Sequence, residues 1–213
     1  MPNLRTFTLS SKKNHLEIKI TKGHFATSHS HTNYYIDVIT QKTNLTAAKA
    51  VADELLTNLS HTMEIDTILC LDNMEVVGTL LASAIPTREF ANVNYGKDIS
   101  ILSPEKTTGS QLIFRDNTIP MIDGKKVLVL ASSVTTGYTA QSSITALKYY
   151  GGTCVAVASI FATTHECIGV PVYSVFDPSD LNDYASYPSH DCPMCQNGEK
   201  VDALINGYGY SKI

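Results

Sequence analysis

The 213-residue sequence has no tryptophan, few charged residues and no long hydrophobic run. Charged residues make up 17% of it and hydrophobic residues 43%. No window approaches the roughly 18 consecutive apolar residues of a membrane-spanning helix. With 12 glycines and 8 prolines, the chain is neither collagen-like nor of low complexity, and its apolar content argues against intrinsic disorder. We therefore expect one folded domain over residues 1–213, without a membrane partner.

Clustered basic residues and a secretory leader are also missing. The formal net charge is −4, which argues against binding to the phosphate backbone of nucleic acids. The first residues lack the apolar core of a signal peptide. Five cysteines, an odd number, are therefore expected to be reduced thiols in a cytoplasmic protein, not a disulfide framework.

The hydrophobic pattern predicts alternating strands and helices. A helix is expected from about residue 44, another over 75–85, ended by Pro86, and a third from the break at 135–137 to about 150. Longer strands are expected at 34–40, 65–71, 127–130, 154–161 and 172–176, with shorter ones at 99–102 and 111–114. Continuous apolar strands separated by helices are typical of an α/β fold, with a mainly parallel, twisted sheet covered on both faces. The polar tail from residue 178 is predicted to be mostly loop.

The helix from residue 44 has a clear apolar stripe and a cap. Thr43 or Asn44 can accept hydrogen bonds from the first free N–H groups of the helix. The apolar positions recur at three- and four-residue steps. They are Leu45, Ala48, Ala52, Leu55 and Leu59.

The most informative stretch is the strand, turn and helix over 127–150. The turn is rich in serine and threonine and contains Gly137, which lets a ligand approach the backbone closely. A helix N-terminus offers unpaired N–H groups and the positive end of the helix dipole. The stretch therefore predicts a cradle for a phosphate monoester. The alternative is that the hydroxyl groups merely cap the helix, and spacing alone leaves both open.

Four segments carry a resemblance to one enzyme family. VLVLASSVTTGYT at 127–139 resembles the phosphoribosyl-diphosphate motif of the type I phosphoribosyltransferases, in which an apolar strand runs into two acids, two more residues and then Thr-Thr-Gly-x-Thr. Within that family the chain resembles the orotate phosphoribosyltransferases most. GHFATSHSHTNYYID at 23–37 resembles the N-terminal segment of the orotate enzymes. SPEKTTG at 103–109 lies where that family has a mobile catalytic loop, and Cys-Pro-x-Cys at 192–195 occurs in some members. The resemblance implies the type I fold, with small peripheral hood segments at 1–33 and 178–213.

The family transfers ribose 5-phosphate from phosphoribosyl diphosphate to a base, with Mg²⁺ as cofactor. The resemblance implies phosphoribosyl diphosphate, a nucleotide or phosphate as ligand, and a homodimer. It assigns the 5-phosphate loop to five consecutive residues: Thr135, Thr136, Gly137, Tyr138 and Thr139. It also places the two sugar-holding acids of the family at the positions of Ala131 and Ser132. Neither Ala131 nor Ser132 supplies negative charge, and a lost electrostatic group of this kind costs on the order of 10²-fold in rate.

Two further segments depart from the family pattern. Asp72 and Asn73 lie where glycine-rich backbone is expected to hold pyrophosphate or its metal, and Asp72 with Glu75 would repel a diphosphate unless Mg²⁺ lies between them. The alternative is that these acids only favour the start of a helix. In the mobile loop Lys106 is the remaining cation and candidate catalytic residue, with the alternative that it is a solvated loop lysine.

Histidines and cysteines form two further candidate groups. His29 or His31 could contact the base or the diphosphate, or could lie in an exposed loop. Cys192 and Cys195 could bind Zn²⁺ if Cys167 and His165, or His190, complete a tetrahedron. Free thiols or a redox pair are the alternatives.

The sequence thus predicts a phosphoribosyltransferase-like protein that keeps a 5-phosphate loop, with weak, altered or lost catalysis in nucleotide metabolism. The alternative is a non-catalytic protein that binds or senses a nucleotide or phosphoribosyl metabolite. The missing acids favour this alternative, whereas the 5-phosphate loop is neutral between the two hypotheses.

Overall fold

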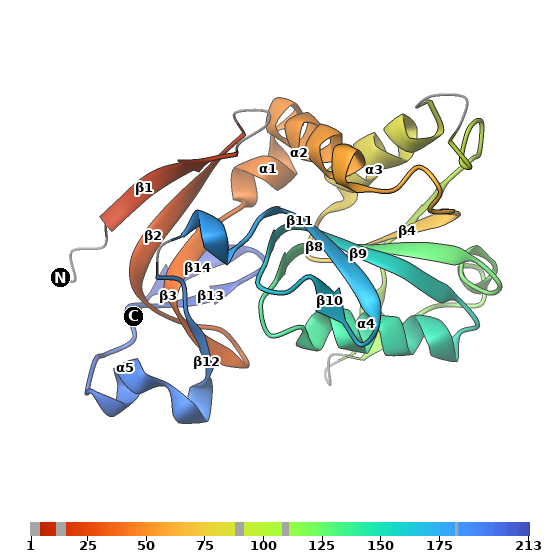
Figure 1. The fold of residues 1–213 in the computed structure, drawn as a ribbon. Helices are drawn as coiled ribbons and strands as arrows, with labels where there is room; N and C mark the ends of the chain where they lie inside the picture. The colour runs from red at the N-terminus through yellow and green to blue at the C-terminus, as the bar shows by residue number, and fades with distance from the viewer. Residues whose placement is uncertain (1–4, 12–15, 88–91, 108–110, 182) are drawn as a thin grey trace.

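The computed structural model describes residues 5–11, 16–87, 92–107, 111–181 and 183–213, and within them the chain forms two six-stranded sheets that lie side by side (Figure 1). The larger sheet has the order β10-β11-β9-β8-β4-β5. Its strands are β4 (Thr67–Cys70), β5 (Ser100–Leu102), β8 (Lys126–Val134), β9 (Thr153–Ala162), β10 (Glu166–Cys167) and β11 (Val170–Phe176). All neighbours pair in parallel except β10 with β11. The predicted mainly parallel α/β sheet is confirmed.

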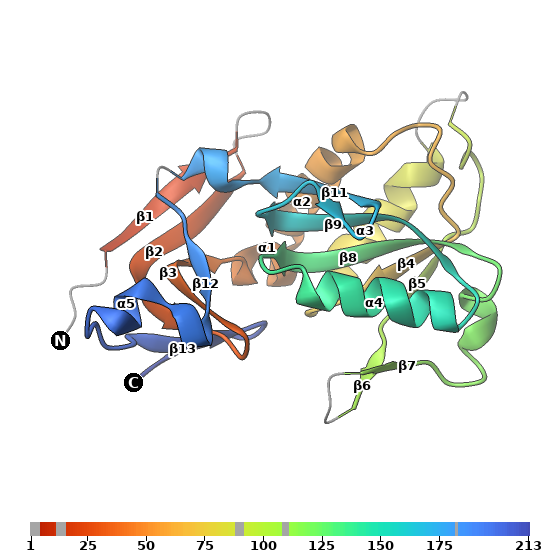
Figure 2. The same cartoon turned by 60° about the horizontal axis from the view of Figure 1, so that its bottom comes forward.

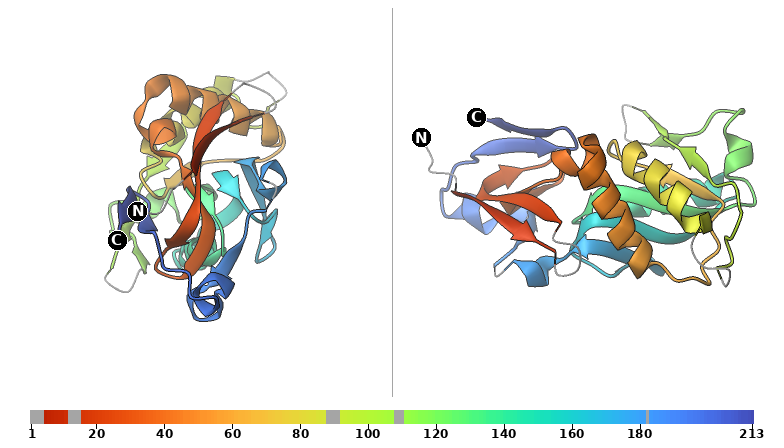
Figure 3. Two further views of the ribbon diagram at one scale, coloured as in Figure 1. Left: turned by 90° about the vertical axis from the view of Figure 1, so that its left-hand side faces the viewer. Right: turned by 90° about the horizontal axis from the view of Figure 1, so that it is seen from above.

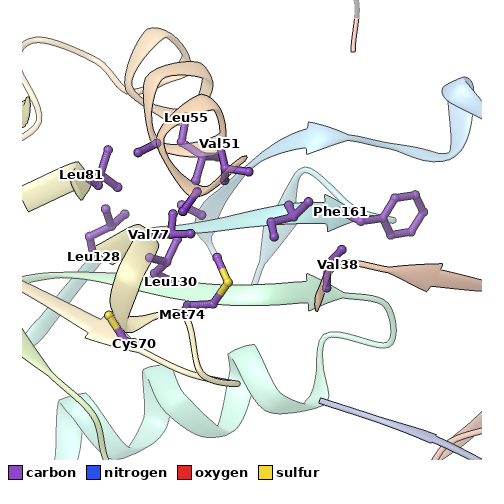
Figure 4. Close-up of a cluster of buried hydrophobic side chains, with 14 of the residues drawn as sticks. Val38, Val51, Leu55, Cys70, Met74, Val77, Leu81, Leu128, Leu130 and Phe161 are labelled. Atoms are coloured by element: carbon purple, nitrogen blue, oxygen red, sulfur yellow. The ribbon is translucent and has the colours of Figure 1, made fainter. Parts of the chain in front are cut away.

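Helices cover both faces of this sheet. Helices α2 (Leu45–Asn58) and α3 (Glu75–Ala84) pack on one face, and α4 (Tyr138–Tyr149) packs on the other (Figure 2). The central strand β8 contributes side chains to the cores on both faces of the sheet, because successive strand side chains point in opposite directions. Leu128 and Leu130 join the core under α2 and α3, where Leu55 and Val77 meet them (Figure 4). Val129 on the other face packs in the core under α4.

Two local predictions for the first helices are confirmed, and two are wrong. Asn44 caps α2, since its side-chain oxygen accepts a hydrogen bond from the Ala47 N–H at 3.1 Å. Helix α3 ends at Ala84 and is followed by a short 3-10 turn, η1 (Ile85–Thr87), that contains the predicted stop, Pro86. Leu45, however, is 67% exposed, and the buried residues of α2 begin at Ala48. The strand predicted at 34–40 ends early, as α1 (Ile39–Thr43) takes its last residues.

The smaller sheet, which we call the hood, is made from both ends of the chain. Its order is β12-β3-β2-β13-β14, with β1 paired to β2. The strands are β1 (Arg5–Ser10), β2 (Glu17–Ala26), β3 (Ser30–Asp37), β12 (Ser186–Pro188), β13 (Ala203–Asn206) and β14 (Gly209–Lys212). Figure 3 shows the N-terminal strands, in red, and the C-terminal strands, in blue, together in this sheet. The prediction of a loop-dominated tail was wrong, because three C-terminal strands find partners there.

The remaining elements are short. The hairpin of β6 (Glu105–Lys106) and β7 (Leu112–Ile113) lies beside α4. Helix α5 (Pro193–Gln196) lies in the hood. Three more 3-10 turns are η2 (Ile119–Met121), η3 (Pro178–Asp180) and η4 (Ser189–Asp191). Across the described ranges, the helices are too short and too polar to cross a membrane.

Two leucines of α2 offer a matched test of this packing. Leu55 is fully buried and Leu45 is 67% exposed. Leu55→Ala is expected to lower the free energy of unfolding by about 2–5 kcal/mol, because it leaves a cavity in the core. Leu45→Ala should change it by less than about 0.5 kcal/mol. Urea denaturation followed by circular dichroism measures both, and equal losses would contradict the packing described.

Candidate functional site

A cavity of about 610 Å³ lies between the larger sheet and the hood. Its floor is formed where β4 and β8 end, and its other walls come from β3, the segment beside β12, and the β13–β14 turn. Open α/β sheets bind ligands at the carboxyl ends of their strands, where loops and helix N-termini converge. This cavity is therefore the candidate site.

The predicted phosphate cradle opens into this cavity. β8 ends at Val134, α4 begins at Tyr138, and Gly137 lies between them at a φ of 73°, in the left-handed region that favours glycine. In the part of the chain that the structure describes, no side chain forms a hydrogen bond that caps α4, so the capping alternative is not realised there. All five predicted residues of the 5-phosphate loop line the cavity: Thr135, Thr136, Gly137, Tyr138 and Thr139.

Thr163, the residue that follows β9, donates hydrogen bonds to the start of this loop. The N–H of Thr163 donates to the Val134 carbonyl at 2.9 Å, and the Thr163 hydroxyl donates to the Thr135 carbonyl at 2.5 Å. The loop carbonyls are thus engaged by the protein. The uncapped N-terminus of α4 is left with its positive dipole end toward the cavity.

The two positions where the family motif has acids differ in environment. Ala131 is 2% exposed and packs in the apolar core under α4. Ser132 lines the cavity, and its hydroxyl lies 3.4 Å from a carboxylate oxygen of Asp72, to which it can donate. The end of β8 therefore presents a hydroxyl group to the cavity and no negative charge.

The loop after β4 supplies the carboxylate that β8 lacks. Asp72 and Asn73 have φ angles of 53° and 62°, a left-handed backbone that is rare outside glycine. Asp72 is the one carboxylate among the described residues that line the cavity, whereas Asn73 lies outside that lining. Glu75 is the first residue of α3 and accepts a hydrogen bond from Ser103 at 2.7 Å. The helix-start alternative therefore describes Glu75, but not Asp72.

Two lysines bring positive charge to the cavity. Lys106, on β6, lines it and places its Nζ 3.6 Å from Asp72 Oδ1. Lys42, at the end of α1, was missed by the sequence analysis. Its Nζ donates to the carbonyls of Asp72 at 2.9 Å and Gly207 at 2.5 Å, which joins the β4 loop to the hood. Burial lowers the pKa of Lys42, against the opposing effect of Asp72. No local pattern marks this lysine, since its acceptors are distant in sequence.

Of the two candidate histidines, one lines the cavity and the other does not. His29 lines the cavity, and its ring lies 4.8 Å from that of Tyr138, centroid to centroid. His31 does not line it, because its Nδ1 points to His24 and Cys195 instead. Of the two, His29 is therefore positioned for a ligand bound over the start of α4.

The predicted zinc ligands are not brought together as a set. Cys167 lies in the larger sheet, with its Sγ 3.7 Å from the Gly137 carbonyl, and His165 is exposed nearby. Cys192 and Cys195 instead meet His24 and His31 in the hood. The spacing of the cysteine pair identified two members, but the histidines come from the N-terminal strands.

Comparison with known proteins finds orotate phosphoribosyltransferases among the relatives of this chain. No protein-family model matches the chain. The orotate phosphoribosyltransferase of Carboxydothermus hydrogenoformans is 28% identical over 199 residues, covering 92% of this chain and 96% of that protein. The orotate phosphoribosyltransferase of Sulfurimonas denitrificans is 26% identical over 197 residues, covering 85% and 90%.

Solved structures show the same fold. The orotate phosphoribosyltransferase of Mycobacterium tuberculosis in complex with inorganic phosphate has a TM-score of 0.52 and 21% identity, over 72% of this chain and 84% of that chain. Its complex with 5-phospho-α-D-ribosyl 1-diphosphate also has a TM-score of 0.52 and 21% identity, over 70% and 83%. The chain therefore has the fold of the type I phosphoribosyltransferases, and its sequence resembles those of the orotate phosphoribosyltransferases.

Proposed function

We propose that this protein binds the 5-phosphate of a ribose compound in its cavity and transfers phosphoribosyl groups slowly or not at all. One observation supports this proposal above others. The uncapped start of α4 opens into the cavity, while the acid positions at the end of β8 hold Ala131 and Ser132. A phosphate-binding group is retained and the groups that stabilise positive charge on the sugar are depleted.

The binding half of the proposal follows from electrostatics. Free N–H groups and the dipole at a helix N-terminus favour a phosphate dianion. Thr135, Thr136 and Thr139 add hydroxyl donors on the same loop, and all of them line the cavity. A cavity of about 610 Å³ is within the usual range for a small-molecule site. Phosphate and phosphoribosyl diphosphate are the ligands in the two Mycobacterium tuberculosis structures, so both are suitable first probes.

The catalytic half follows from the charge that the site lacks. Transfer from phosphoribosyl diphosphate develops positive charge on the ribose, and fixed negative groups lower that barrier. Ser132 contributes only a hydroxyl, and Ala131 is buried among apolar side chains. Asp72 comes from the neighbouring loop after β4, where Lys106 partly neutralises it at 3.6 Å. We therefore expect turnover on the order of 10²-fold or more below that of an enzyme with both acids.

The residues present fit the Mg²⁺ that the family uses, but the described lining of the cavity offers it one carboxylate only. Mg²⁺ is commonly held by one or two carboxylates together with the phosphates of a ligand. Asp72 would hold it here, with the Ser132 hydroxyl close by. When bound with a diphosphate, the ion would neutralise the negative charge of the leaving group. Mg²⁺ binding should therefore depend on a bound phosphate ligand.

A second function, sensing of a nucleotide without catalysis, is favoured by one specific observation. Among the described residues at the cavity, Asp72 is alone in carrying a carboxylate. A binding protein needs the phosphate loop but not the acids. Assays that report binding and turnover separately distinguish the two functions.

The first test measures binding and turnover in parallel. Isothermal titration calorimetry with ribose 5-phosphate, uridine and adenosine monophosphates and phosphoribosyl diphosphate plus Mg²⁺ should give binding of at least one ligand. Orotate consumption, followed by ultraviolet absorbance, should be at least about 10²-fold slower than for the Mycobacterium tuberculosis enzyme assayed alongside. Absence of all binding contradicts the first half of the proposal, and turnover at equal rates contradicts the second.

The phosphate loop has a matched glycine control. Gly137 and Gly124 have φ angles of 73° and 69°, and an added Cβ would meet no atom closer than 3.7 Å at either. Both alanine variants should therefore lose about 1–2 kcal/mol of stability through backbone strain alone. Only Gly137→Ala should also weaken binding of the phosphate ligand, by about tenfold, because it displaces the N–H groups of α4. Equal affinities in the two variants would exclude the loop as the phosphate site.

The missing charge can be restored at Ser132. Ser132→Asp should increase Mg²⁺-dependent turnover by at least about tenfold, since its carboxylate would face the cavity beside Asp72. Ser132→Asn, which has the same shape without the charge, is the control and should not. Ala131→Asp is unsuitable as the first variant, because it places a charge in the apolar core. If Ser132→Asp and Ser132→Asn have the same rate, loss of this acid is not what limits catalysis.

A further inference from the structure

Four side chains with metal-binding atoms meet in the hood, away from the cavity. We call His24, His31, Cys192 and Cys195 the Cys–His cluster. Each offers one ligand atom, and these atoms all lie within 4.8 Å of one another. They come from β2, from β3 and from α5 with its preceding residue. We propose that the Cys–His cluster is a structural Zn²⁺ site that ties the C-terminal segment to the N-terminal strands.

The distances between ligand atoms fit one tetrahedral ion. Zinc bonds of about 2.0–2.1 Å to nitrogen and 2.3 Å to sulfur place two nitrogens about 3.4 Å apart, and a nitrogen and a sulfur about 3.6 Å apart. His24 Nε2 lies 3.0 Å from His31 Nδ1, 3.6 Å from Cys192 Sγ and 3.7 Å from Cys195 Sγ. Cys195 Sγ lies 3.3 Å from His31 Nδ1. Four of the six edges are thus within about 0.4 Å of a zinc tetrahedron.

The tautomer of His24 is set for metal binding. Its Nδ1 lies 3.1 Å from the backbone carbonyl of Glu199, and a carbonyl can only accept, so Nδ1 carries the proton. In a neutral imidazole the other nitrogen, Nε2, then has its lone pair free, and it is Nε2 that faces the cluster. Zinc-ligating histidines typically donate their second ring N–H to a carbonyl or carboxylate in this way. This contact is independent of the four-residue geometry and also indicates a metal.

The burial of the cluster is that of a structural site. His24 is 3% exposed and Cys192 is 1% exposed, whereas Cys195 is at the surface. All five cysteines are free thiols, so Cys192 and Cys195 are not joined in a disulfide. Two cysteines and two histidines complete the four ligands of a closed zinc site and leave no position for substrate. The chemistry therefore favours a cross-link over a second catalytic centre.

A cross-link at the Cys–His cluster would affect the cavity through the turn that joins β2 to β3. The strands that carry His24 and His31 are joined by a turn at 27–29, and His29, in this turn, lines the cavity beside Tyr138. The His24 backbone N–H also donates to Asp202, just before β13, at 2.8 Å. A zinc ion at the cluster would therefore hold the turn against the C-terminal segment. Zinc binding should stabilise the hood without being needed for phosphate binding at α4.

The test uses the full chain without an affinity tag, so that no added histidines bind metal. Protein from cells grown with zinc should contain about one Zn²⁺ per chain by plasma mass spectrometry. Replacement by Co²⁺ should give the visible bands of a tetrahedral site and a sulfur-to-cobalt charge-transfer band. Removal of zinc by a chelator should lower the midpoint of thermal unfolding by at least about 5 °C, and Zn²⁺ added back should restore it.

Matched variants locate the site. Cys195→Ser and His31→Ala should lose stoichiometric zinc and the cobalt charge-transfer band, or greatly weaken both. Cys154→Ala and His165→Ala change the same residue types outside the cluster and should retain both signals. Cys195 also reports directly, because an exposed free thiol is accessible to a thiol reagent whereas a metal-bound thiolate is protected. Its reaction should require the chelator.

Three results would overturn the proposal. They are a zinc content near zero with Cys195 reactive from the start, a Cys192–Cys195 disulfide in protein purified without oxidant, and zinc retained unchanged in the two cluster variants. None of them bears on phosphate binding, which is measured separately by calorimetry. The zinc site and the proposed function can therefore fail independently.

Discussion

The positive end of α4 organises the cavity, because no side chain among the described residues caps it with a hydrogen bond. β8 delivers the chain to the carboxyl edge of the sheet, Gly137 turns it in a left-handed conformation, and the helix starts without a cap. Bonds from Thr163 hold the loop carbonyls. N–H groups that nothing in the protein satisfies are costly unless water or a ligand satisfies them. Under the proposed function a phosphate would satisfy them, and this loop would then anchor the rest of the ligand.

The charges around that anchor are arranged differently from those implied by the family motif. The motif concentrates negative charge at the end of the strand, where ribose would lie, but here the strand ends in Ala131 and Ser132. The nearest carboxylate, Asp72, comes from the neighbouring loop and is shared with Lys106. Binding and catalysis respond differently to this change, since phosphate affinity depends on the helix dipole whereas the rate depends on charge placed near the sugar.

The hood completes the cavity from the opposite side and joins the two ends of the chain. In the sequence, its strands precede and follow those of the larger sheet, so its assembly depends on contacts between residues that are far apart in the chain. Lys42 contributes to this closure by bonding the β4 loop and the β13–β14 turn together. The residues of the Cys–His cluster are outside the lining of the cavity, and His24 also contacts Glu199 and Asp202.

Local patterns determined much of the larger sheet. The apolar runs at 65–71, 127–130, 154–161 and 172–176 became β4, β8, β9 and β11, because buried parallel strands require side chains that are apolar on both faces. The start of α2 followed from Asn44, and the phosphate loop followed from Gly137 and its threonines, since caps and tight turns depend on neighbouring residues.

Tertiary structure alone decided what distant segments do together. The polar tail became strands only because the N-terminal strands offered edges to pair with, and the run at 34–37, within β3, is the part of that sheet that the sequence predicted. The spacing of Cys192 and Cys195 identified two candidate zinc ligands, and the sequence analysis expected Cys167 and His165 as the other two. In the folded chain, His24 and His31 lie beside the cysteine pair instead. Lys42 and the carboxylate of Asp72 gained their roles in the same way. A sequence records which groups are present, but the distance between groups far apart in the chain exists only after the chain has closed on itself.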